Sequence, residues 1–138
     1  MATGLRVGTD LLLIGELDRL SERPWFLAAW YTDDELAYAG SLGWTRRREF
    51  LSGRFAAKEA VAKLLGARLF GEVRPCQIEV ARRPTGEPLV RLAGAARVRA
   101  ADIGLSQVAV SISHKRSIVL AVAVGSCHKS PRPSPCRP

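Results

Sequence analysis

Two carboxylates and a lysine stand where they could bind a divalent cation and a phosphate. Asp10 lies inside the aliphatic segment LRVGTDLLLI, residues 5–14, where burial of an ionised carboxylate is costly unless a partner compensates it. Glu59 and Lys63 are four residues apart in a segment with helical periodicity, so they share one helix face. Carboxylate oxygens are the ligands that Mg²⁺ prefers. These three residues therefore form the first candidate site.

The same residues also have ordinary structural explanations, which the residues alone leave open. Asp10 could accept hydrogen bonds from backbone amides at a strand end, or pair with an arginine. Glu59 and Lys63 could form a solvated ion pair worth only about 0.3–0.5 kcal/mol. The neighbouring Arg54 and Lys58 favour the functional interpretation, because a basic face around one carboxylate suits a multiply charged phosphate bound through a metal.

A third candidate, His114, ends the alternating segment VAVSISH, residues 108–114. Because alternate residues of a strand lie on the same face, His114 shares a face with apolar residues. A half-buried structural histidine is therefore the default interpretation. Ser111 and Ser113 fall on the opposite face, which argues against a nucleophilic pair with His114. The sequence contains neither GxxxxGK[ST] nor GxGxxG, so we expect nucleotide binding by neither of those loops.

The element that must position Glu59 and Lys63 is the strongest predicted helix, residues 49–66. Its apolar residues recur at helical spacing along one stripe: Phe50, Ala57, Val61 and Leu64. Gly66 is a plausible helix end. Thr32 and Glu35 have the spacing of a capping box, which predicts the start of another helix.

The remaining segments predict strands and short helices. Residues 5–14 indicate a strand buried on both faces, residues 15–20 the opening of a helix, and residues 93–103 a short exposed helix. Residues 77–80 and 89–92 indicate two short strands joined by a turn around 84–88, and residues 108–114 and 118–124 a β-hairpin. Strands and helices in this order predict an α+β fold.

Composition bounds the class of protein. The chain has 138 residues, 47% hydrophobic and 25% charged, which is typical of one soluble domain and excludes a wholly disordered chain. Its net charge of +8 favours anionic partners: nucleic acid, a phosphorylated small molecule, an acidic protein or a membrane surface. We predict a domain over residues 1–125 and a disordered Pro/Ser/Arg-rich tail over residues 126–138.

Targeting and cysteine signals are weak. The apolar runs fall short of the ~20 residues that cross a bilayer, and no basic segment precedes a signal-peptide core, so we expect a cytoplasmic protein. The three cysteines lack CxxC spacing, which suggests neither a disulfide framework nor a zinc site. Cys127 and Cys136 are interpreted as loose thiols of the tail, although they could pair or share a metal with His128.

Three separated segments together resemble one family. VGTDL (residues 7–11) resembles the start GxGTDIVEI, FLSGRFAAKEAVAK (residues 50–63) is similar to FLAGRFAAKEAxxK, and VSISH (residues 110–114) matches a strand motif. These motifs are those of the holo-acyl-carrier-protein synthases, the short class of 4′-phosphopantetheinyl transferases. The resemblance extends from residue 5 to about residue 124, and its long central motif is specific.

The resemblance implies a phosphopantetheinyl transferase-like fold, with a long helix packed on an antiparallel sheet in a single domain. It also implies an activity: Mg²⁺-dependent transfer of 4′-phosphopantetheine from coenzyme A to a serine of an apo acyl carrier protein, releasing adenosine 3′,5′-bisphosphate. By position, Asp10 and Glu59 would hold Mg²⁺ and Lys63 would neutralise the leaving phosphate. Glu59 or a metal-bound water would take the serine proton.

The implied coenzyme A contacts and assembly complete this expectation. Arg54 and His114 would fasten the phosphates of coenzyme A, while Gly86 and Pro88 would lie near its adenine. Short members of the family form homotrimers with each active site between two subunits. The partners would be coenzyme A and an acyl carrier protein of fatty acid or polyketide synthesis, with no nucleic acid and no membrane. The chain departs from the family pattern at a few positions: Leu13, Arg68, Gln77 and Lys115.

Two other classes of function compete with the enzyme. The +8 charge and the run Arg46–Arg48 would suit a nucleic-acid-binding module, but no RNP, zinc-finger or helix-turn-helix signature accompanies them. The chain could also be an inactive relative used as an interaction subunit, although Asp10, Glu59 and Lys63 are intact. In the enzyme interpretation, Arg19 and Arg23 join the Arg46–Arg48 run in steering an acidic carrier protein.

Overall fold

The computed structural model of the chain describes residues 3–128. Its first half contains one strand and the longest helix, in the order β1 (Thr3–Leu13), η1 (Ile14–Leu17), η2 (Leu20–Glu22), α1 (Pro24–Trp30), α2 (Asp33–Gly40) and α3 (Trp44–Leu65). Its second half contains four strands and one α-helix, in the order η3 (Pro75–Gln77), β2 (Ile78–Arg82), β3 (Pro88–Leu92), α4 (Gly94–Asp102), β4 (Leu105–Lys115) and β5 (Ile118–His128).

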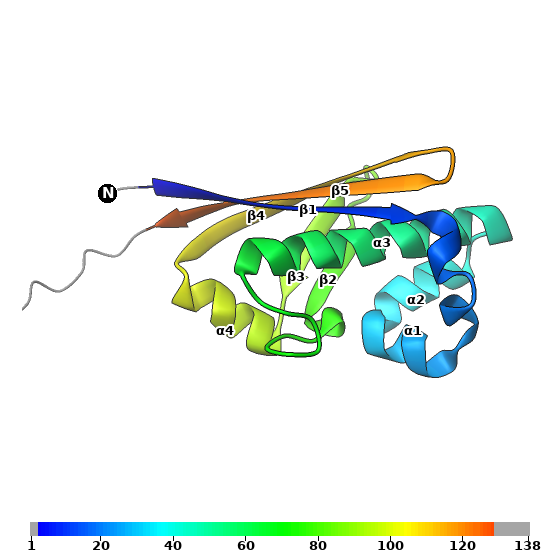
Figure 1. The fold of residues 1–138 in the computed structure, drawn as a ribbon, viewed down its shortest axis with the longest axis horizontal. Coiled ribbons are helices and arrows are strands. Elements are labelled where there is room, and N and C mark those ends of the chain that lie inside the picture. Colours follow the sequence, from blue (N-terminus) through cyan, green and yellow to red (C-terminus); the bar gives the residue numbers. More distant parts are fainter. Residues whose placement is uncertain (1–2, 129–138) are drawn as a thin grey trace, which may run out of the picture.

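Helix α3 packs under a three-stranded antiparallel sheet of order β1-β5-β4 (Figure 1). Strands β2 and β3 pair only with each other in a separate antiparallel hairpin. Helices α1 and α2 lie at one end of the molecule and α4 toward the other (Figure 1). The expected α+β class and the long helix on an antiparallel sheet are therefore confirmed.

The capping and helix-end signals are confirmed as well. Thr32 Oγ1 accepts the backbone N–H of Glu35, and a Glu35 carboxylate oxygen accepts that of Thr32, so α2 begins with the predicted capping box. Gly66 ends α3 in the left-handed conformation at φ 65°, which glycine adopts without strain. The helix begins at Trp44, five residues before the predicted start, because the apolar periodicity does not extend into its exposed first turn.

Gly8 is where β1 and α3 approach most closely. A Cβ atom at this position would collide with the backbone oxygen of Ala60 and lie 2.8 Å from the nitrogen of Leu64. Ala56, Ala57 and Ala60, all fully buried, keep the facing side of the helix small. The strand therefore rests almost on the helix backbone, and this contact sets the position of Asp10 relative to the last turns of α3.

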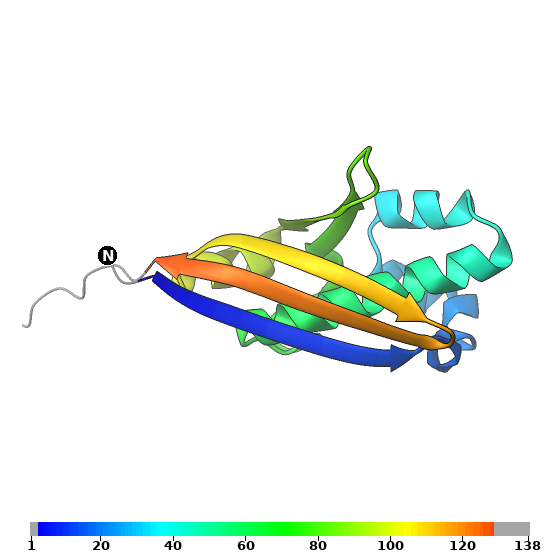
Figure 2. The ribbon, with the colours of Figure 1, turned by 90° about the horizontal axis from the view of Figure 1, so that it is seen from above.

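The prediction that residues 5–14 are buried on both faces is wrong within this chain. Gly8 and Leu12 face α3, but the alternate residues face outward. Figure 2, seen from above, shows no described element over that outer face of the sheet. Its exposed apolar side chains come from two neighbouring strands: Leu5, Val7, Leu11, Leu13, Ile118, Leu120 and Val124. An uncovered apolar sheet face this continuous is typical of an interface.

The C-terminal hairpin is longer than predicted. Strand β5 continues to His128 and pairs with Thr3–Leu5, so the predicted tail begins too early at Ser126. Cys127, interpreted from sequence as a loose thiol, is a buried strand residue at 7% exposure, because its side chain points to the helix-covered face of β5. Cys136 and the rest of the predicted tail lie outside the described residues. Among residues 3–128, no helix combines the length and apolarity that a membrane span requires.

The close approach at Gly8 generates a stability prediction. Gly8→Ala should lower the free energy of unfolding by about 1–3 kcal/mol, because the added methyl group must push β1 away from α3. Urea denaturation followed by circular dichroism measures the change. Gly4→Ala, on the same strand with no atom within 4 Å of its would-be Cβ, is the matched control and should be close to neutral. Equal losses in both variants would contradict the tight contact.

Candidate functional site

Asp10 and Lys63 meet across the β1–α3 contact. Lys63 Nζ lies 3.2 Å from Asp10 Oδ1 and donates a 2.9 Å hydrogen bond to the backbone oxygen of Thr9. The Asp10 side chain is 17% exposed and that of Lys63 56%. The partner of Asp10 in the structure is thus this lysine, rather than the arginine or backbone amides considered from the sequence.

Glu59 belongs to the same cluster, one helical turn before Lys63. Burial raises the pKa of Glu59, the negative charge of Asp10 raises it further, and Lys63 opposes the shift. A divalent cation bound beside Glu59 would relieve this unfavourable negative charge. Among residues 3–128, no group of three or more His, Cys, Asp or Glu side chains is placed to hold a metal. Mg²⁺ commonly takes one or two carboxylates and completes its shell with phosphate oxygens and water.

The four residues predicted to contact coenzyme A line one hollow of about 300 Å³. Arg54 comes from α3, His114 from the end of β4, Gly86 from the β2–β3 turn and Pro88 from the start of β3. Other residues complete its wall: Tyr38, Leu42, Arg46, Glu49, Phe50, Gly53, Arg82 and Ile112. The structure therefore brings together three segments that are remote in sequence, with three arginines and a histidine around one hollow.

The β2–β3 connection requires glycine at position 86. Gly86 has φ 95°, a conformation that side chains rarely tolerate. Its N–H donates to the oxygen of Arg83, and Arg83 N–H donates to the oxygen of Glu87, both at 2.8 Å. The Arg82 guanidinium folds back toward Gly86 and lies 5.2 Å from the Tyr38 ring centroid. This tight turn brings Pro88 to the rim of the hollow.

The acidic cluster and the hollow lie on different sides of α3. Neither Asp10, Glu59 nor Lys63 lines the hollow. Along an α-helix, Glu59 is rotated from Arg54 by about 140° and Lys63 by about 180°. One chain therefore presents the predicted site residues as two separate groups, and it does not close them around one ligand.

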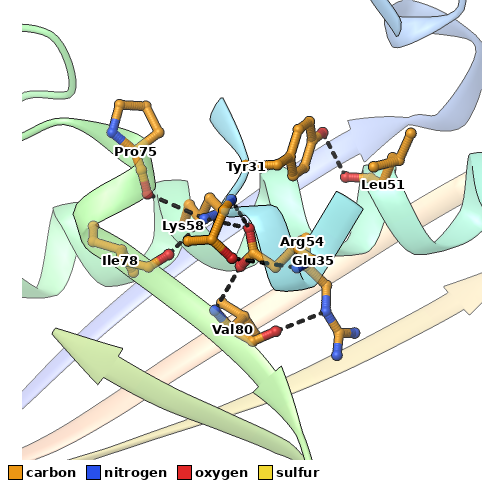
Figure 3. Close-up of polar contacts among 9 residues, drawn as sticks. Tyr31, Glu35, Leu51, Arg54, Lys58, Pro75, Ile78 and Val80 are labelled. Carbon is orange, nitrogen blue, oxygen red and sulfur yellow. Dashed lines mark hydrogen bonds and ion pairs between the residues drawn. The ribbon is translucent and has the colours of Figure 1, made fainter. Parts of the chain in front are cut away.

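The expected basic face of Arg54 and Lys58 around Glu59 is wrong. Lys58 is fully buried and its Nζ lies 3.0 Å from a Glu35 carboxylate oxygen. Arg54 donates through Nε to the oxygen of Val80 at 3.1 Å (Figure 3). Both side chains point toward β2, because one step along the helix turns about 100° and separates their stripe from that of Glu59.

Sequence reasoning missed several residues of this region. Glu35 was interpreted only as a helix cap, and Lys58 only as a surface charge. Tyr38 and Arg82 line the hollow without having been predicted there. The position of Arg82, two residues before the predicted turn at 84–88, was a signal for it.

The arginine run does not act as one patch. Arg48 makes two 2.8 Å hydrogen bonds to the carboxylate of Asp18, whereas Arg46 lines the hollow. The Asp18 interaction lowers the pKa of that carboxyl group, mainly through the hydrogen bond from Arg48. Arg48 thus ties the second turn of α3 to the segment that follows β1.

A family model, the sequences of known proteins and a solved structure all point to the same family. A family model described as the 4′-phosphopantetheinyl transferase superfamily matches residues 6–123. The chain is 40% identical to a holo-[acyl-carrier-protein] synthase of Moorella thermoacetica over 87% of this chain and 92% of that protein. It is 38% identical to the enzyme of the same name from Clostridium novyi over 90% and 93% of the two chains.

A solved structure gives the same result for the fold. A holo-(acyl-carrier-protein) synthase from Bacillus anthracis, determined in complex with CoA (3′,5′-ADP), superposes with a TM-score of 0.77 at 28% identity, covering 92% of this chain and all of that one. The predicted family and enzyme class are thereby confirmed. The chain belongs to the holo-acyl-carrier-protein synthase family and is, as a member of it, a 4′-phosphopantetheinyl transferase.

Proposed function

We propose that this chain transfers 4′-phosphopantetheine from coenzyme A to a serine hydroxyl of an apo acyl carrier protein, with Mg²⁺ as cofactor. The observation that carries the proposal is the meeting of Asp10, Glu59 and Lys63 at the β1–α3 contact in a chain of this family. The hollow around Arg54 and His114 supports binding of coenzyme A, because guanidinium and imidazole groups suit its phosphates.

Asp10 and Glu59 would hold the Mg²⁺. The pair fits the ion, since both are hard oxygen donors and the negative charge of Asp10 disfavours ionisation of Glu59 in the metal-free chain. When bound, the cation supplies Lewis-acid stabilisation of the charged phosphate oxygens. Lys63 adds a positive charge beside them, and its flexible stem allows the ammonium to leave Thr9 and Asp10 for a phosphate oxygen.

The transfer itself is a substitution at phosphorus. The serine oxygen forms a bond to the phosphorus that carries the pantetheine, and the bond from that phosphorus to the bridging oxygen of adenosine 3′,5′-bisphosphate breaks. Glu59 accepts the serine proton as the general base. Lys63 offsets the negative charge on the departing bisphosphate.

We further propose that the working enzyme is a homotrimer in which two chains share each site. Two observations support this assembly: the acidic cluster and the hollow lie on different sides of α3, and the outer sheet face is apolar and uncovered (Figure 2). Burying that face between copies would bring the acidic cluster of one chain toward the hollow of its neighbour.

The transfer is tested by intact-mass spectrometry of apo carrier proteins from fatty acid and polyketide synthesis. With coenzyme A and Mg²⁺, at least one carrier should gain the mass of phosphopantetheine. Asp10→Ala and Glu59→Ala should each reduce the rate at least about 100-fold, because each removes a ligand of the charge-stabilising ion. Asp102→Ala, an exposed carboxylate at the end of α4, is the control. No mass gain on any carrier would refute the activity.

The ionisation of Glu59 gives a second test. Without Mg²⁺, its pKa should lie above the ordinary value of 4.5, and Asp10→Asn should lower it because the substitution removes a neighbouring negative charge. Since a raised carboxyl pKa favours the protonated form, stability contributed by Glu59 is lost as pH rises through that pKa. Glu59→Gln should therefore stabilise the metal-free protein at pH 7. Carbon-detected NMR titration and urea denaturation measure the two effects, and an unshifted Glu59 would contradict them.

Shared sites are tested by mixing two variants. Asp10→Ala disables the acidic cluster and His114→Ala weakens the hollow, so co-expressed chains should show more activity than the average of the two separate proteins. A site is intact only when one chain supplies Asp10 and its neighbour supplies His114. With random mixing of equal amounts, about a quarter of the sites meet this condition, so the rate should reach at most about a quarter of the wild-type rate.

Light scattering should give three chains per particle for both variants. Leu11→Arg in the outer sheet face should abolish the trimer and the rescue, whereas Val98→Arg, exposed on α4, should preserve both. A monomeric wild-type mass would exclude the proposed assembly.

A further inference from the structure

The buried pair Glu35–Lys58 joins three elements at one point. The Glu35 and Lys58 side chains are 1% and 0% exposed, and Lys58 Nζ lies 3.0 Å from Glu35 Oε2. The ammonium also donates to the backbone oxygens of Pro75 at 3.1 Å and Ile78 at 2.6 Å. Thus α2 and α3 both hold the start of β2 (Figure 3).

Every polar group of this pair has a partner. Glu35 Oε1 accepts the N–H of Val80 at 2.7 Å, and Oε2 accepts the N–H of Thr32 at 2.9 Å. Removing two charges from water is costly, and well-packed apolar residues often stabilise a core as well as a buried ion pair does. A fully satisfied pair instead gives directional constraints that apolar side chains lack.

Those constraints act on a hairpin that, within residues 3–128, forms no strand pairing with the main sheet. Strands β2 and β3 pair only with each other, so side chains must fix β2 against α3. The same hairpin carries Arg82, Gly86 and Pro88 into the candidate coenzyme A hollow. The hollow's geometry therefore depends on where β2 is held.

Val80 connects the pair to Arg54. Its N–H is held by Glu35, and its oxygen accepts Nε of Arg54 at 3.1 Å. With Nε occupied in this way and the guanidinium 4.3 Å from the Phe50 ring centroid, the orientation of Arg54 is set, and its side chain lines the hollow. Glu35 is thus linked through one residue, Val80, to an arginine that is predicted to bind phosphate.

We propose that Glu35 and Lys58 are positioning residues for coenzyme A: through Val80, they hold Arg54 and the β2–β3 hairpin in the geometry that receives its phosphates. This inference rests on the proposed function of the hollow. It adds a role for two residues that touch no ligand themselves.

The test uses the double variant Glu35→Gln/Lys58→Met, which removes both charges with little change in volume. Calorimetry in Mg²⁺ should show coenzyme A binding weakened about tenfold, within the range over which residues in contact couple. Tyr31→Phe is the matched control: its hydroxyl bonds the oxygen of Leu51 at 2.9 Å in the same buried cluster but does not hold β2, and binding should be unchanged. Unaltered affinity in a folded double variant would overturn the proposal.

A thermodynamic cycle separates positioning from general loosening. Arg54→Ala should weaken binding by itself, and adding Glu35→Gln/Lys58→Met should then cost little more, because the pair acts through Arg54. If the losses of binding free energy in Arg54→Ala and in the double variant simply add, the pair does not act through Arg54. If the double variant does not fold, Glu35→Gln alone should still weaken binding about threefold, and an unchanged affinity there counts equally against positioning.

Hydrogen exchange at the Val80 amide reports on the pair without any ligand. The amide should be protected in the wild type and in Tyr31→Phe, and it should exchange at least about tenfold faster in the double variant. Unchanged protection would overturn the proposal. A wild-type chain that fails to bind coenzyme A, yet shows the expected exchange, would contradict the proposed function of the hollow and leave the hold on β2 established.

Discussion

The geometry of a single helix governs what this chain can do alone. Side chains on α3 turn about 100° with each residue, so the segment from Arg54 to Lys63 projects them around the whole helix. Glu59 and Lys63 face Asp10 on β1, while Arg54 and Lys58 face β2. A continuous motif thereby serves two separate surfaces, which is why we expect each complete site to need two copies of the chain.

The two surfaces are held by different kinds of force. On the β1 side, small residues let strand and helix touch, and the position of Asp10 follows from the contact at Gly8. On the β2 side, no backbone hydrogen bond within residues 3–128 links the hairpin to the main sheet, so apolar packing of Ile78 and Val80 and buried polar side chains supply the connection. A directional ion pair fits that task better than apolar packing, because it fixes one arrangement of strand against helix.

Local patterns predicted local structure well. The Thr32–Glu35 capping box and the glycine at position 66 gave the correct start of α2 and end of α3, because each signal depends on a few neighbouring residues. Helical spacing likewise separated Glu59 and Lys63 from the core stripe. The cost of an ionised carboxylate in an aliphatic segment singled out Asp10, and the family motifs supported its pairing with Glu59, which no local signal connects to β1.

Non-local contacts account for the errors. The aliphatic residues of β1 alternate onto two faces, and an apolar face looks the same in sequence whether this chain or a second copy covers it. Lys58 was expected at the surface because periodicity defines a stripe without saying what packs on it; only the fold brings Glu35 and the oxygen of Ile78 to its ammonium. The strand end at Ser126–His128 was hidden for the same reason, since its pairing with β1 spans nearly the whole chain.

The acidic cluster carries a local electrostatic cost. Burial and Asp10 both disfavour the ionised form of Glu59. In the metal-free chain, the ionised Glu59 is therefore less stable beside Asp10 than it would be alone. Lys63 offsets part of this cost, and its side chain is 56% exposed. A buried, immobile cation such as Lys58 would neutralise the carboxylates permanently and compete with any divalent ion. Lys58 is thus enclosed where it contacts β2, whereas Lys63 is exposed beside the proposed metal site.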